Sequence, residues 1–230
     1  MVYQEKTMLN KVLVISVHPD DETLGAGGTL LKHKSLGNRI FWLNITGIHE
    51  EQGFTKDDIY YRSTILDRVS KAYEFDDLID LNLPTMALDK YSQKELVEKI
   101  SNVIKTIKPS ILYIPFKDDV HTDHQMVFKA CWSASKSFRH PFIKRVLMME
   151  TISETDFAVP TQSSWFIPNV FVDITDHMDK KLEIIKIYEN ELGLHPFPRN
   201  VDNIRALATY RGSMCNSKYA ESFMLLKEIL

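Results

Sequence analysis

Two clusters of histidine and carboxylate side chains have the composition of a metal site. The first directly follows an apolar, β-branched run and has the sequence His18-Pro19-Asp20-Asp21-Glu22. The second lies far along the chain and has the sequence His121-Thr122-Asp123-His124. Zinc takes imidazole nitrogen and carboxylate oxygen, and a catalytic zinc keeps one position open for water. We therefore expect folding to bring His18, Asp21 and His124 to one ion.

Asp20 is adjacent to the candidate ligand Asp21 in a tight turn, so we expect its side chain to point toward the metal-bound water. Bound zinc brings the pKa of that water to about 7. A nearby carboxylate can then accept its proton as the water attacks a carbonyl carbon. We interpret Asp20 as this general base. The alternative is an Asx turn or a helix N-cap, both of which are common for aspartate.

The second cluster leaves His121 free if His124 is the ligand. A free imidazole could stabilise a tetrahedral oxyanion or protonate a leaving amine, with Asp123 or another carboxylate orienting its ring. We expect this cluster in a loop after a strand, not on a helix. Two alternatives stay open. One is a zinc site that uses all of these side chains, and the other is a solvated polar loop in which residues 117–119 are plain surface charge.

Two arginines and a run of glycines complete the candidates. Guanidinium groups suit carboxylate and phosphate, so Arg62 and Arg211 are candidate substrate ligands, although each can instead be a structural ion-pair partner. The segment Gly25-Ala26-Gly27-Gly28 invites a nucleotide-phosphate interpretation, but a Pro-Asp-Asp-Glu segment separates it from the strand. We interpret these glycines as sites of close packing between a helix and the sheet.

Hydrophobic patterns predict the elements that position these residues. Short apolar runs predict strands at residues 11–17, 39–45, 78–81, 111–115, 145–151 and 164–174. Helical spacing predicts helices at residues 29–35, 57–74, 93–107, 175–192 and 201–211. The alternation predicts an α/β fold with a mostly parallel sheet flanked by helices. Both clusters then lie at carboxyl ends of strands, where doubly wound folds bind ligands.

Composition narrows the class of protein. No linker divides the 230 residues, so we expect a single domain over 1–230. The 28 basic and 31 acidic residues give a net charge of -3, which provides no field for nucleic acid, so the expected partner is a small molecule. Two cysteines predict a reducing, cytoplasmic compartment. No stretch is long and apolar enough to predict a transmembrane segment.

The two clusters resemble the motifs of the PIG-L (LmbE-like) family of zinc-dependent N-acetylglucosaminyl deacetylases, His-Pro-Asp-Asp-Glu after the first strand and His-Pro-Asp-His later. Thr122 departs from the usual proline, which should alter the stiffness of the loop without touching a ligand. The similarity spans nearly the whole chain, since it also includes the glycine-rich turn to Gly28, the helix of Arg62, Arg211-Gly212 and residues 219–223.

The resemblance implies a Rossmann-like fold with three metal ligands, His18, Asp21 and His124. It also implies that Asp20 is the general base and that His121 is the electrostatic or acid partner. The implied substrates are N-acetylated sugars or related amides, and the family favours small homo-oligomers.

We therefore predict a metal-dependent hydrolase that removes the N-acetyl group from an N-acetylamino sugar or its conjugate by attack of zinc-bound water, in glycan or glycoconjugate biosynthesis. Fe²⁺ or Co²⁺ could occupy the same ligands. Two other functions remain open. The first is an amidase that cleaves another C–N bond, such as a thiol-conjugate amide, and the second is a non-catalytic sugar-binding module with a vestigial metal site.

Overall fold

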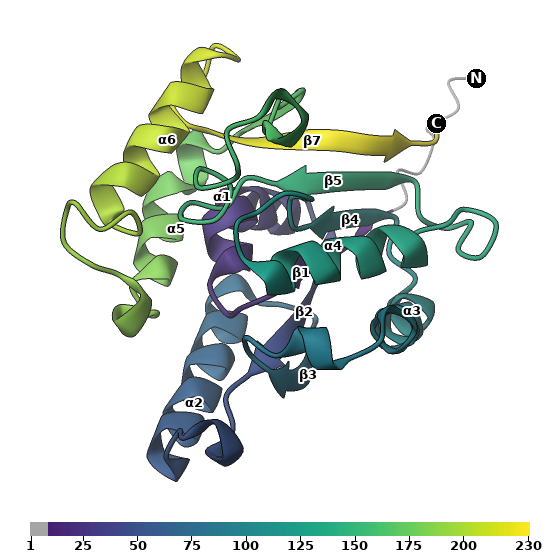
Figure 1. Ribbon diagram of the computed structural model, residues 1–230. Coiled ribbons are helices and arrows are strands. Elements are labelled where there is room, and N and C mark those ends of the chain that lie inside the picture. Colours follow the sequence, from purple (N-terminus) through teal and green to yellow (C-terminus); the bar gives the residue numbers. More distant parts are fainter. Residues whose placement is uncertain (1–8) are drawn as a thin grey trace.

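One seven-stranded sheet lies at the centre of the protein, with the strand order β3-β2-β1-β4-β5-β7-β6. The computed structural model describes residues 9–230. Within them the strands are β1 (Lys11–Ser16), β2 (Arg39–Gly47), β3 (Asp77–Pro84), β4 (Ile111–Ile114), β5 (Arg145–Met149), β6 (Val170–Asp173) and β7 (Ala220–Glu228). The strands β1 to β5 are parallel, and β7 runs antiparallel between β5 and β6 (Figure 1).

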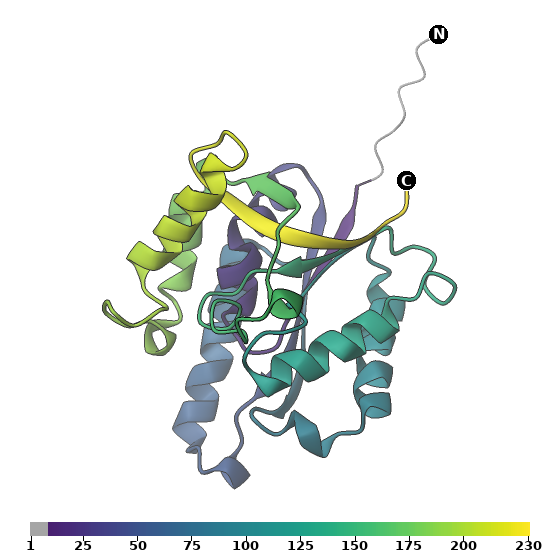
Figure 2. The same ribbon diagram turned by 45° about the horizontal axis from the view of Figure 1, so that its top comes forward.

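Helices cover both faces of this sheet (Figures 1 and 2). They are α1 (Asp21–Ser35), α2 (Lys56–Tyr73), α3 (Gln93–Ile107), α4 (Thr122–Ala134), α5 (Met178–Ile185) and α6 (Val201–Ser213). The helices α1, α2, α5 and α6 pack on one face, and α3 and α4 pack on the other. The predicted Rossmann-like α/β class is confirmed. Within residues 9–230, no helix is long and apolar enough to cross a membrane.

The β1 strand shows why the sheet is buried on both faces. Val12 and Val14 belong to the core on the side of α1, whereas Leu13, Ile15 and Val17 belong to the core on the side of α3 and α4. Successive side chains of a strand point to opposite faces, so an unbroken apolar run is the pattern of a strand with helices on both sides. The strand is thereby fixed rigidly, and so is the turn that follows it.

The glycines of α1 allow this helix to approach its neighbours closely. A Cβ atom on Gly25 would lie 2.9 Å from Cβ of Met149, and one on Gly28 would lie 2.7 Å from Cβ of Ile174. The predicted close packing is confirmed. The predicted start of this helix at residue 29 is wrong, because α1 begins at Asp21 and contains the glycines. Tertiary packing here outweighs the low helix propensity of glycine.

The second half of the chain differs from the prediction. The strand expected over 164–174 contains only Val170–Asp173, after Pro168, which has no N–H for a ladder hydrogen bond. The helix expected over 175–192 is α5, which ends at Ile185, after which Tyr188 donates a hydrogen bond to Glu22 Oε1 at 2.7 Å. This contact with the last residue of the first cluster lies where periodicity alone continues the helix. The long strand β7 was not predicted.

Candidate metal centre and active site

The turn after β1 carries the first cluster. The strands β1 and β4 are adjacent and parallel, with Val14 opposite Tyr113, so both clusters follow strands at the same edge of the sheet. Asp21 is the first residue of α1, and its Oδ2 accepts hydrogen bonds from the backbone N–H groups of Val17 at 2.8 Å and His18 at 2.9 Å. The Asp21 carboxylate therefore closes the turn and fixes where His18 leaves the strand.

His18, Asp21 and His124 converge at this edge. Nε2 of His124 lies 3.3 Å from Nδ1 of His18 and 3.4 Å from Oδ2 of Asp21. Ligand atoms in a tetrahedral zinc shell, each roughly 2 Å from the ion, are about 3.3 Å apart. One ligand atom from each of the three residues can be chosen so that all lie within 4.8 Å of one another. These three residues thus have the spacing that one small divalent ion requires.

The electrostatics of His124 also fit a cation. Its Nδ1 lies 2.8 Å from Oδ2 of Asp119, so a proton on Nδ1 leaves a lone pair on Nε2 that faces Asp21. Burial alone lowers the pKa of His124, but the carboxylates of Asp21 and Asp119 overcome it and raise this pKa to about 9. Positive charge is therefore favoured at this point, and two imidazoles with one carboxylate are a donor set that suits a divalent metal.

Asp119 contacts a candidate ligand, and sequence reasoning missed it. Its side chain is fully buried, and its Oδ1 accepts a hydrogen bond from Oγ1 of Thr155 at 2.6 Å. The interpretation of residues 117–119 as surface charge is wrong at this position. Asp119 precedes His124 by less than two helical turns, but only the fold shows that the chain between them bends so that the two side chains meet.

His121 lies at the start of a helix, so the predicted loop is wrong. It is the N-cap residue of α4, and its Nδ1 accepts a hydrogen bond from the backbone N–H of Asp123 at 3.1 Å. Because Nδ1 accepts, the proton of a neutral ring is on Nε2, which can act as a donor. Burial lowers the pKa of His121, and the adjacent His18 lowers it further, which favours the neutral ring.

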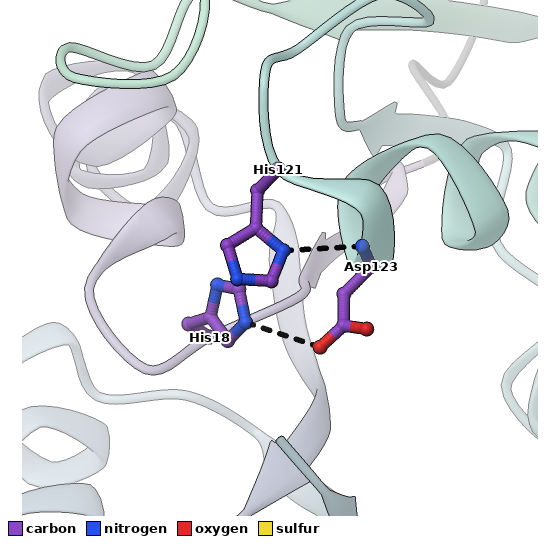
Figure 3. A group of neighbouring side chains, drawn as sticks. All are labelled: His18, His121 and Asp123. Atoms are coloured by element: carbon purple, nitrogen blue, oxygen red, sulfur yellow. Dashed lines mark hydrogen bonds and ion pairs between the residues drawn. The ribbon is translucent and has the colours of Figure 1, made fainter. Parts of the chain in front are cut away.

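The carboxylate of Asp123 faces His18 and not His121 (Figure 3). Its Oδ2 lies 3.6 Å from Nε2 of His18, and its two oxygens accept hydrogen bonds from the N–H groups of Met86 at 2.7 Å and Leu88 at 3.2 Å. The expectation that the Asp123 carboxylate orients the His121 ring is therefore wrong, because the backbone N–H of Asp123 makes this contact. His18, His121 and Asp123 also form a possible metal group, which shares His18 with the first group.

Asp20 is buried beside the candidate ligands. The residue is 2% exposed, its φ of 135° is in the left-handed region, and it makes no side-chain cap hydrogen bond to α1. Burial raises the pKa of Asp20 and the adjacent Asp21 raises it further, while Arg199 opposes both. The alternative role of an N-cap side chain is thus absent, and the carboxylate is available for other contacts.

A cavity of about 340 Å³ opens over these residues. It is lined by His18, Asp20, Thr46, Gly47, Ile48, Arg62, Thr85, Met86, His121, Glu154, Glu191 and Arg199. Arg62 therefore reaches the cavity, where its NH2 lies 3.4 Å from Oε1 of Glu191. Sequence reasoning missed Glu154, Glu191 and Arg199, which have no local motif and come from segments distant in sequence.

The structure does not bring Arg211 to this cavity. Its Nε donates a hydrogen bond to Oε2 of Glu150 at 2.9 Å, and Oγ of Ser222 donates to the same oxygen at 2.6 Å. Arg211 thus ties α6 to the residue after β5 and to β7. This is the structural ion pair that was the alternative to substrate binding.

The fold and the site together define an α/β protein with a candidate divalent-metal centre at the carboxyl edge of its sheet. The chain belongs to the PIG-L family, described as GlcNAc-PI de-N-acetylase, whose sequence profile matches residues 13–135. The matched segment contains both clusters, and the predicted family is confirmed.

Known proteins resemble the chain over nearly its whole length. It is 25% identical over 240 residues to a diacetylchitobiose deacetylase from Thermococcus kodakarensis, covering 96% of this chain and 85% of the relative. A conserved protein from Thermus thermophilus has a similar structure, with a TM-score of 0.77, 22% identity and coverage of 96% of this chain and 97% of that one. The N,N'-diacetylchitobiose deacetylase from Pyrococcus horikoshii has a TM-score of 0.76, 20% identity and coverage of 95% and 84% respectively.

Proposed function

We propose that this protein is a metal-dependent N-deacetylase that removes the acetyl group from an N-acetylamino sugar or its conjugate. The observation that carries the proposal is the convergence of His18, Asp21 and His124, with 3.3 and 3.4 Å between their facing atoms. Membership of the PIG-L family and the similarity to a diacetylchitobiose deacetylase support a sugar amide as the substrate.

His18, Asp21 and His124 would hold the ion, with Zn²⁺ as the first candidate and Fe²⁺ or Co²⁺ as alternatives. When bound, the ion supplies a Lewis acid that lowers the pKa of water and polarises the acetyl carbonyl. Asp119 would orient the His124 ring and Asp123 the His18 ring, as carboxylates commonly do for ligating histidines.

The remaining residues would move the protons. Asp20 accepts a proton from the water that attacks the acetyl carbon. His121, whose proton is on Nε2, donates a hydrogen bond to the carbonyl oxygen as this oxygen becomes negative. The proton on Asp20 then passes to the amine nitrogen as the C–N bond breaks. The products are acetate and the free amino sugar.

We also propose that the protein works in a reducing, cytoplasmic compartment. Both cysteines are free thiols, with Cys131 buried and Cys215 partly exposed. Cytosolic proteins keep thiols in this state, whereas secreted ones usually pair them.

The test is release of acetate by the protein loaded in turn with Zn²⁺, Fe²⁺ and Co²⁺. The substrates are free, nucleotide-linked and lipid-linked N-acetylglucosamine, diacetylchitobiose and an N-acyl thiol conjugate. We expect metal-dependent acetate from at least one N-acetyl sugar, with one free amine formed per acetate. Turnover of the thiol conjugate alone would favour the amidase, and sugar binding without turnover in metal-loaded protein would favour the binding module.

A further inference from the structure

Asp20 has a buried carboxylate oxygen that the fold leaves without a hydrogen bond. Within residues 9–230 its Oδ2 has no hydrogen-bond partner, and Nη1 of Arg199 lies 3.5 Å from it. A buried charge without a partner is costly, and the Arg199 guanidinium offsets part of that cost, since it opposes the rise that burial and Asp21 cause in the pKa of Asp20. Nε of Arg199 is also buried and has no hydrogen-bond partner among the residues that the structure describes. A small movement of either side chain would therefore allow a hydrogen bond between Arg199 and Asp20.

The segment before α6 holds Arg199 in place. The backbone N–H of Gly193 donates to the carbonyl of Arg199 at 3.0 Å, and the Arg199 guanidinium carbon lies 5.6 Å from the centre of the Phe197 ring. Next along the chain, the side chain of Asn200 caps α6 by accepting from the N–H of Asn203 at 2.9 Å. The guanidinium is thus presented from an ordered turn.

Glu191 fixes the other side of the same guanidinium. Its Oε2 lies 3.4 Å from NH2 of Arg199, and its Oε1 lies 3.4 Å from NH2 of Arg62. The cavity is therefore lined by a row of side chains with alternating charges, Asp20, Arg199, Glu191 and Arg62. Arg199 contacts both carboxylates, so rotation of its guanidinium away from Asp20 would also break its contact with Glu191.

We propose that Arg199 is a positioning residue for Asp20: it holds the Asp20 carboxylate in the orientation in which that carboxylate accepts the proton of the attacking water. This inference rests on the proposed function. It differs from a direct substrate contact, because Arg199 would act through Asp20 and change turnover more than substrate affinity. It also differs from a purely structural ion pair. If Arg199 only supported the fold, we would not expect added guanidinium to restore the turnover of a variant that lacks this side chain.

The first experiment compares Arg199→Ala with Arg205→Ala, another arginine variant close in sequence. Arg205 lies on α6 and pairs with Asp179 at 3.6 Å, away from the residues that line the cavity. In metal-loaded protein with diacetylchitobiose we expect Arg199→Ala to lower kcat by roughly ten- to a hundredfold, the usual cost of losing a supporting partner. KM should stay nearly unchanged. Arg205→Ala should keep both constants.

Chemical rescue then separates positioning from structural support. Guanidinium chloride, added far below the concentrations that unfold the protein, should restore part of the kcat of Arg199→Ala. It should not raise the activity of Asp20→Ala, in which the carboxylate that the guanidinium would hold is missing. A change confined to KM, or a loss of kcat that guanidinium does not restore, would overturn the positioning role.

The second experiment does not depend on turnover. Urea midpoints are measured for Asp20→Asn, Arg199→Gln and the double variant. If the two side chains interact, the shifts of the single variants do not add up to the shift of the double variant. Additive shifts would overturn the contact. Wild-type protein that releases no acetate from any substrate would overturn the proposed function, and a non-additive cycle would show that the contact itself still exists.

Discussion

At the scale of residues, neighbouring carboxylates and backbone N–H groups hold the candidate ligands in place. Asp119 lies 2.8 Å from Nδ1 of His124, and Asp123 lies 3.6 Å from Nε2 of His18. Asp21 is held by two backbone N–H groups. Because such partners fix the tautomer and direction of a ligand, their loss weakens metal binding even though they do not touch the ion.

We expect His124→Ala to lose the metal, because it removes one of the three candidate ligands. Asp119→Asn should keep the metal but bind it roughly ten- to a hundredfold more weakly, since it removes the charge that orients His124. Elemental analysis and competition with a chelator measure both effects. His49→Ala is the control, because His49 contacts the carbonyl of Asn82 and is not in either candidate metal group. Stoichiometric metal in His124→Ala would refute the ligand assignment.

For Asp20→Ala we expect normal metal content and a loss of turnover by a factor of about 10² to 10⁴, the usual contribution of a general base. Acetate release and elemental analysis on the same sample separate the two properties. The exposed Asp176, changed to alanine, controls for the loss of an aspartate in general. Full activity of Asp20→Ala would contradict the role of general base.

The sequence predicts the residues of the site that lie in local motifs and misses those that the fold supplies. His18, Asp20 and Asp21 are consecutive or nearly so, and the turn after β1 alone brings them together. Arg199 reaches Asp20 from a segment before α6, and no pattern near either residue indicates that contact. Arg211 is the opposite case, a residue that the sequence offers for the site and that the fold places elsewhere. A guanidinium can bind a substrate or a structural carboxylate, and here it binds the carboxylate of Glu150.

At the scale of elements, a buried ion pair fastens α1 to the C-terminal part of the fold. Nζ of Lys181 on α5 lies 2.7 Å from Oε1 of Glu221 on β7 and donates to the carbonyl of Leu24 at 2.9 Å. The Glu221 carboxylate also accepts from the N–H groups of Gly28 at 2.8 Å and Thr29 at 2.7 Å. The glycine-rich part of α1 and segment 219–223, both of which match the family pattern, are thus joined to each other by these contacts.

Lys181→Met should destabilise the protein by about 3–5 kcal/mol, because it leaves the charge of Glu221 buried without its cation. Urea unfolding measures the difference. The neighbouring Lys180→Met is a matched control, since Lys180 is exposed and pairs with the exposed Glu183, and it should change stability by less than about 0.5 kcal/mol. Equal effects of the two variants would show that the buried pair contributes no special stability.

The pattern of apolar residues predicts helices and strands well where burial is uniform. It predicts them poorly where tertiary contacts determine where an element begins or ends. The predicted bounds of α3 agree with the structure because a regular apolar stripe faces the sheet and Pro109 follows. The helix over 175–192 fails because Tyr188 turns inward to Glu22. The strand β7 has polar residues toward both of its ends, so its sequence lacks a clear strand signal although it lies between β5 and β6.

At the scale of the whole molecule, the two halves of the chain share one sheet and the core on the side of α1. The strand β7 comes from the C-terminal end, pairs with β5 and β6, and packs Phe223 against Tyr113 of β4. The core on the side of α1 likewise contains residues from β1, α2, α5 and α6. We therefore propose that the predicted single domain unfolds as one cooperative unit.

Thermal unfolding tests this proposal together with the metal site. We expect a single transition, because neither half can keep its apolar face buried alone. An ion present at 100 times its Kd stabilises the folded state by about 2.7 kcal/mol, which for a chain of this size raises Tm by roughly 5–11 °C. Stripping the metal with a chelator should reverse the shift in wild-type protein and leave the Tm of His124→Ala unchanged. Two separate transitions would contradict the single domain, and a Tm that does not respond to metal would contradict a centre built from His18, Asp21 and His124.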